Sequence, residues 1–154
     1  FQLITQVAGR AGRGVNPGEV ILQTALPEHS TIQQAAKQDY LAFYNDEIAT
    51  RKAFSFPPFC KIVKFLYSGK DEARLFEFAS EFRRLLLEEL PENFVCHPVV
   101  PCGHAKVKDL FRYQFLVRGA NTGAITQAIE LVDKKLALPS SISRFVDVDP
   151  THTF

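Results

Sequence analysis

Apolar residues recur along the second half of the chain with two different periods. Arg112–Arg118 alternates apolar and polar side chains, as a half-buried strand does. Asp71–Leu90 and Asn121–Leu138 instead repeat apolar residues at helical spacing, which predicts two amphipathic helices. Three further segments are predicted to be strands: Lys61–Tyr67, Phe94–Val100 and Ser143–Asp149.

The predicted order of elements is strand, helix, strand, strand, helix, strand, which is the ferredoxin-like split βαβ order. One sheet with both helices on the same face would bury both apolar stripes at once. We therefore predict an α/β (α+β) domain over residues 60–154. The predicted inner faces of the helices consist of Ala73, Phe76, Ala79, Phe82, Leu86 and Leu90 in the first and Ile125, Ala128, Ile129, Val132 and Leu136 in the second.

A helical connector is predicted over residues 28–59, upstream of this domain. Thr31–Lys52 has loose helical spacing, with Ser30 as its cap and a break near Gln38. The paired prolines exclude a helix across residues 54–59.

The residues Glu47 and Arg51 of this connector are one helical turn apart. They form either an exposed ion pair, worth about 0.3–0.5 kcal/mol, or an anchor between domains.

The first 27 residues contain the segment with the clearest chemistry, the octet Gln6–Arg13. If this segment is helical, Gln6, Arg10 and Arg13 lie within an arc of about 60°. Two guanidiniums beside glycines suit a polyphosphate that gains charge in a transition state. Residues 20–24 are predicted to form a strand that follows this segment.

The octet resembles motif VI of superfamily-two helicases, Gln-x-x-Gly-Arg-x-Gly-Arg. This resemblance implies that residues 1–27 are the end of the second RecA-like helicase lobe. It implies further that Arg10 and Arg13 act on the γ-phosphate of ATP, and that Gln6, Gly9 and Gly12 lie in the nucleotide site. The alternative is a basic helix, weakened by glycine, on a solvated surface.

Later segments resemble the carboxyl-terminal region of the PriA (primosomal protein N′) family of replication-restart helicases. The matching features are Glu47 and Arg51, Phe56-Pro57-Pro58-Phe59, Phe111-Arg112-Tyr113-Gln114 and Asp147-Val148-Asp149-Pro150. The chain departs from the family pattern at Pro98–Pro101, where the family has Gly-Pro-x-Pro. It departs again near Lys108–Leu110, where a glycine is expected.

The resemblance implies a parent enzyme that couples ATP hydrolysis, with Mg²⁺, to 3′-to-5′ DNA unwinding at stalled forks. It implies forked or single-stranded DNA, single-stranded-DNA-binding protein and primosome proteins as partners, and a bacterial cytoplasmic location. The family's zinc lies in an insert upstream of motif VI, so no metal site is expected here.

The chain begins at Phe1 and contains no Met, so we expect it to be a piece of a longer protein. It has no phosphate-binding loop and no Asp-Glu box, and we therefore expect no ATP hydrolysis from this piece alone. No apolar run approaches the roughly 20 residues of a membrane span, and no segment here has the order of residues of a secretory signal, so no membrane partner is expected.

Net charge is +1, and the basic excess is confined to residues 91–118. Lys106, Lys108, Arg112 and Gln114, with Phe111 and Tyr113 between them, form a candidate DNA or partner contact. The alternative is a solvated loop with its aromatic rings facing the core. Alternation predicts Phe111, Tyr113, Phe115 and Val117 on one face of the strand and Arg112, Gln114 and Leu116 on the other.

The remaining titratable residues give weaker signals. The three cysteines form no Cys-x-x-Cys pair, which argues against a zinc site made of cysteine alone and leaves open a mixed site with His97 and His104. Asp147 and Asp149 are predicted to serve as a cap or as salt-bridge partners. Two other functions stay open: a stand-alone module that binds nucleic acid or protein, and the tail of another superfamily-two helicase.

Overall fold

The computed structural model describes residues 1–11 and 18–151, which divide into two compact units, 1–54 and 55–154. The domain limits predicted at residues 27 and 59 stay a prediction.

The first unit contains helices α1 (Gln2–Ala8), α2 (Ser30–Ala36) and α3 (Tyr40–Ala53). Gln38, with a φ of 56°, separates α2 from α3, so the predicted break is confirmed. The predicted cap at Ser30 is wrong, because His29 Nδ1 accepts the Thr31 amide at 3.3 Å and α2 begins at Ser30 itself. Asp39 caps α3 by accepting the Ala42 amide at 3.0 Å.

Residues 18–24 contain no strand, so the strand predicted over residues 20–24 is wrong. A strand needs a neighbour for its backbone N–H and C=O groups, and the described part of the first unit contains only helices. Ile21 is consequently 88% exposed. The prediction relied on the apolar residues of this segment, which do not by themselves supply a partner strand.

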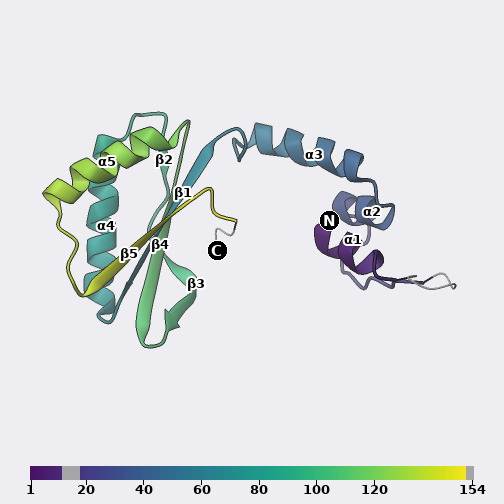
Figure 1. The fold of residues 1–154 in the computed structure, drawn as a ribbon, viewed down its shortest axis with the longest axis horizontal. Coiled ribbons are helices and arrows are strands. Elements are labelled where there is room, and N and C mark those ends of the chain that lie inside the picture. The colour runs from purple at the N-terminus through teal and green to yellow at the C-terminus, as the bar shows by residue number, and fades with distance from the viewer. Residues whose placement is uncertain (12–17, 152–154) are drawn as a thin grey trace. The chain divides into compact units, whose positions relative to one another are not determined.

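The second unit is a sheet with two helices. Its elements are β1 (Lys61–Gly69), α4 (Glu72–Glu89), β2 (Val95–Cys96), β3 (Val100–Val107), β4 (Leu110–Gly119), α5 (Thr122–Lys135) and β5 (Ile142–Val148). The strand order is β2-β4-β1-β5, β3 pairs with β4, and these pairs are antiparallel. Helices α4 and α5 lie side by side on one face of the sheet (Figure 1). The predicted ferredoxin-like arrangement is confirmed.

The sequence between α4 and β4 differs most from its prediction. The strand predicted over residues 94–100 shrinks to the two residues of β2, and an unpredicted strand, β3, follows it. The sequence did not indicate this strand because it contains Pro101 and Gly103 and follows Pro98, and proline and glycine are poor strand residues. Lys106 therefore lies on a strand and not in a loop, which corrects its predicted position.

Strands β3 and β4 form a hairpin with an irregular register between Pro101 and Lys106. Lys108 and Asp109 make its turn, with φ values of 48° and 61°. Two-residue hairpin turns of type I′ require positive φ at both central positions. Both turn positions are thus occupied by residues other than glycine.

The core lies between the sheet and the two helices. Phe65 of β1 stacks on Phe115 of β4 with ring centroids 4.7 Å apart, and Phe82 of α4 packs 5.9 Å from Phe65. The predicted inner residues of α5 are confirmed, with Ile129 and Leu136 half-buried at its margin. Four predicted inner residues of α4 are also confirmed: Ala79, Phe82, Leu86 and Leu90.

Ala73 and Phe76 were wrongly predicted to face the core. Ala73 is exposed and Phe76 is 45% exposed, whereas Leu75 and Phe78 are buried in their place. Successive three-residue steps drift around a helix by about 60° each, so the series 73, 76, 79 leaves the apolar face. Phe76 packs instead against Tyr113, with ring centroids 5.3 Å apart.

Gly119, at the end of β4, is required by close packing. A Cβ atom there would lie 1.9 Å from Cε1 of Phe94, a side chain that is only 6% exposed. We predict that Gly119→Ala lowers the free energy of unfolding by about 1–3 kcal/mol. Gly123→Ala is the control, since its nearest contact would be 3.5 Å away, and its stability should be unchanged or slightly higher. Equal urea midpoints for the two variants would contradict this packing.

Candidate nucleic-acid interface

The described part of the octet lies at the end of α1. The helix ends at Ala8, and the Gly9 amide caps it by donating to Thr5 O at 2.9 Å. Arg10 then donates to Val7 O at 3.1 Å, a tighter turn than that of an α-helix. The predicted helix is therefore wrong over residues 9–11, because glycine favours a helix end over a helix interior, and residues 12 and 13 lie outside the described part of the chain.

Gln6, Gly9 and Arg10 are all exposed. Gly12 and Arg13 lie outside the described residues. The roles assigned to these five residues in nucleotide binding and phosphoryl transfer stay predictions.

Glu47 and Arg51 form an ion pair along α3. Arg51 Nε donates to Glu47 Oε1 at 2.7 Å, and the side chains are 42% and 44% exposed respectively. Such a pair adds little to stability because solvent screens it. The anchoring of neighbouring domains by this pair stays a prediction.

The basic residues of the hairpin differ in their surroundings. Lys106 lies 5.0 Å from the centre of the Phe111 ring and 3.6 Å from the Asp109 carboxylate. Lys108 is exposed in the turn. Lys106 thus has local partners for its charge, whereas Lys108 extends into solvent.

Strand β4 divides its side chains between two faces, as alternation predicted. Phe111 and Tyr113 pack against the core, and the Tyr113 hydroxyl donates to Glu72 Oε1 of α4 at 3.0 Å. Arg112 and Gln114 belong to the opposite face. Phe111 and Tyr113 therefore pack on the helix side of the sheet, and their position does not support a role in stacking on DNA bases.

The helix-free face of the sheet holds two adjoining cavities. The larger has a volume of about 610 Å³ and a mainly apolar lining, which includes Phe56, Ile62, Pro98 and Leu116. Arg118 lies at its margin, 5.7 Å from the centre of the Phe56 ring. The pKa of His97, which also lines it, is lowered by burial and by the Arg118 and Arg83 charges.

The smaller cavity measures about 260 Å³ and shares Gly103 and Gln114 with the larger one. Its lining is Lys64, Leu66, Cys102, Gly103, His104, Arg112 and Gln114. This described lining contains two cations and a histidine and no carboxylate. Burial raises the pKa of the Cys102 thiol, while the nearby Arg112 and Lys64 charges lower it. The cavity suits a negatively charged ligand.

Lys64 and Leu66 were not identified from the sequence. They come from β1 and share the cavity with Cys102, Gly103 and His104 of β3. The outward positions of β1 could have shown that they lie on one face. Their closeness to Arg112 depends on the register between β1 and β4, which pairs Ser68 with Arg112 and Leu66 with Gln114.

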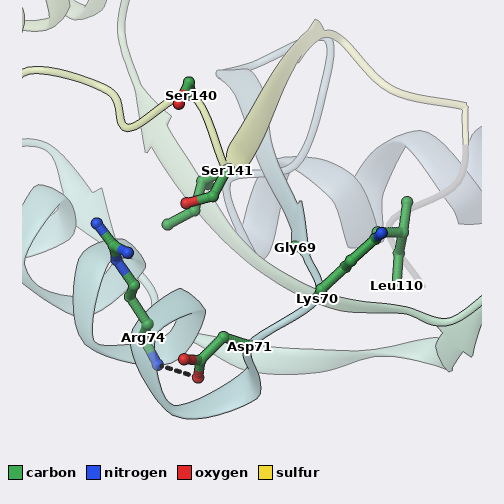
Figure 2. Close-up of a pocket in the computed structure, with 8 residues that line it drawn as sticks. Gly69, Lys70, Asp71, Arg74, Leu110, Ser140 and Ser141 are labelled. Atoms are coloured by element: carbon green, nitrogen blue, oxygen red, sulfur yellow. Dashed lines mark hydrogen bonds between the residues drawn. The ribbon is translucent and has the colours of Figure 1, made fainter.

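A further cavity, of about 420 Å³, lies where α4 begins (Figure 2). Lys70, Arg74, Ser140 and Ser141 line it and offer positive charge and hydroxyl groups. Asp71 caps the helix by accepting the Arg74 amide at 3.1 Å. Its carboxylate takes the position that a bound anion would occupy, so we assign no ligand to this cavity.

Asp149 forms the predicted salt bridge, to Lys61 at 2.7 Å, and Ile62 N donates to its other carboxylate oxygen at 3.3 Å. The hydrogen bond from Lys61 lowers the pKa of this carboxyl group. Over residues 1–11 and 18–151, no three His, Cys, Asp or Glu side chains converge as metal ligands would. Within the same residues, no helix has the length and apolar character to span a membrane.

Comparison with known proteins identifies relatives along the whole chain. This chain is 42% identical over 154 residues to the replication restart protein PriA of Chlamydia pneumoniae, and the match covers 100% of this chain and 21% of that protein. It is 32% identical over 152 residues to the replication restart protein PriA of Treponema pallidum, covering 99% of this chain and 23% of that protein. The chain thus spans about a fifth of the length of these curated relatives.

Among solved structures, the de novo designed protein Foldit4 is similar with a TM-score of 0.45 and 14% identity, covering 60% of this chain and 99% of that one. The family model of the primosomal protein N C-terminal domain matches residues 52–151, which include strands β1 to β5 and helices α4 and α5. The chain belongs to the primosomal protein N C-terminal domain family.

Proposed function

We propose that this chain is the carboxyl-terminal part of an ATP-dependent 3′-to-5′ DNA helicase that restarts replication at stalled forks. The observation that carries the proposal is 42% identity over all 154 residues to a replication restart protein PriA. That similarity includes the octet as well as the sheet domain. Action at bacterial forks would place the protein in the cytoplasm, with single-stranded-DNA-binding protein and primosome proteins as partners.

In this function the octet completes an ATP site whose other parts lie in the rest of the parent. Arg10 and Arg13 would stabilise the charge that develops on the γ-phosphate, with Gln6, Gly9 and Gly12 beside the nucleotide. Mg²⁺ and the attacking water would be held by other motifs of the parent, and its zinc by the upstream insert. The sheet domain would contact the fork through the hairpin and the helix-free face.

A stand-alone binding module would use the same basic surface but would not need the octet. Likewise, the tail of an unrelated helicase would not need residues 52–151 to match this family. Similarity over both parts of the chain favours the replication-restart helicase.

We predict that Arg10→Ala or Arg13→Ala in the full-length parent lowers DNA-stimulated ATP turnover by about 10³-fold or more, with thermal stability unchanged. Lysine at either position should not rescue turnover, because it lacks the planar guanidinium. Arg74→Ala, an exposed arginine on α4, is the control. Turnover equal to that of the control would contradict the proposed role, as would phosphate release by the 154-residue chain alone.

We predict that replacing Lys106, Lys108 and Arg112 together by Ala weakens fork-DNA binding and flattens its salt dependence, because fewer counterions are released. The matched control replaces Lys70, Arg74 and Lys134, which are exposed cations of the same unit. Affinity would be measured at two salt concentrations. If both triple variants lose affinity equally, bulk charge accounts for the binding and the hairpin has no special role.

A further inference from the structure

The edge strand β5 presents an aromatic side chain on the helix-free face. Its Arg144 faces the helices, donating to both carboxylate oxygens of Asp133 on α5, at 2.7 and 2.6 Å, and lying 4.7 Å from the Phe82 ring centre. Alternation along β5 therefore places the next residue, Phe145, on the opposite face. Phe145 is 60% exposed there.

The strand register places this ring beside the basic cavity. Phe145 of β5 is the Cα partner of Leu66 on β1, and Leu66 is the partner of Gln114 on β4. Leu66 and Gln114 line the cavity that Lys64, Arg112 and His104 also line. Directly opposed side chains on one face have Cβ atoms about 5 Å apart, so Phe145 and the cavity wall are neighbours.

We propose that this face binds single-stranded DNA, with a base stacked on Phe145 and a backbone phosphate in the cavity of Lys64, Arg112 and His104. The proposal rests on the DNA-binding role proposed above and assigns it to particular residues. An exposed ring beside cations is the arrangement that single strands require. A duplex would conceal the faces of its bases, and an acidic peptide would need the cations without the ring.

Acidic groups on β5 and just beyond its end limit the path of the DNA strand. Asp147 on β5 is the Cα partner of Lys64, and Asp149 is paired with Lys61. By the same register argument Asp147 adjoins the cavity wall on its β5 side, whereas the other lining residues come from β3 and β4. The phosphates should therefore follow the β4 side, and Asp147 should oppose binding by repulsion.

The test measures binding of a fluorescein-labelled oligothymidine to the whole 154-residue chain by anisotropy. Phe145→Leu keeps the apolar bulk and removes the ring, and we expect its Kd to rise about tenfold or more. Phe76→Leu is the matched control, since Phe76 is 45% exposed on α4, and its Kd should not change. Asp147→Asn should bind more tightly than the native chain, with a smaller gain at high salt.

Equal Kd values for Phe145→Leu and the native chain would overturn the proposal. So would weaker binding by Asp147→Asn, or a Phe145-dependent affinity for an acidic peptide without affinity for the oligonucleotide. Should Phe145→Leu unfold, as thermal melting would show, Asp147→Asn alone decides. Neither variant changes Lys106, Lys108 or Arg112. Weak fork binding by the variant that lacks these three cations, together with unchanged binding by Phe145→Leu, would therefore refute this inference and leave the proposed function standing.

Discussion

The pairing of β1 with β4 on one side and β5 on the other determines the arrangement of the second unit. Because β1 is central, its alternating side chains supply both faces of the sheet. Phe65 and Tyr67 extend towards the helices and are fully buried, whereas Lys64 and Leu66 lie on the helix-free face and are half-buried. A shift of the register by one residue would exchange these two sets, burying a lysine in the core.

The same strand pairing gives the two faces of the sheet basic groups with different surroundings. On the helix side, basic groups have acidic partners close by, as Arg144 has Asp133, Arg84 has Glu81 and Glu88, and Lys135 has Glu89. In the cavity of the helix-free face, the described lining brings Lys64, Arg112 and His104 together, with Asp147 as the Cα partner of Lys64 on the neighbouring strand. In the first set, only Arg144–Asp133 and Lys135–Glu89 join different elements, and the cations of the second set suit a bound phosphate.

Periodicity predicted most of this fold because both helices and the long strands pack one apolar face against a shared core. It failed where the chain departs from such packing, at β3 with its prolines and at residues 20–24, which have no partner strand among the residues that the structure describes. It predicted part of the candidate site, since alternation alone placed Arg112 and Gln114 on one face of β4. Lys64 and Phe145 could not be found this way, because their closeness to Arg112 depends on register between distant strands.

Backbone amide chemical shifts of the isotope-labelled chain, followed during titration with single-stranded DNA, test most directly whether the helix-free face is the nucleic-acid interface. Our interpretation predicts shifts that change along the outward positions of β1, β4 and β5, around Lys64, Arg112 and Phe145, while α4 and α5 stay unaffected. Changes centred on the exposed positions of α4 and α5, with the sheet residues unmoved, would contradict it.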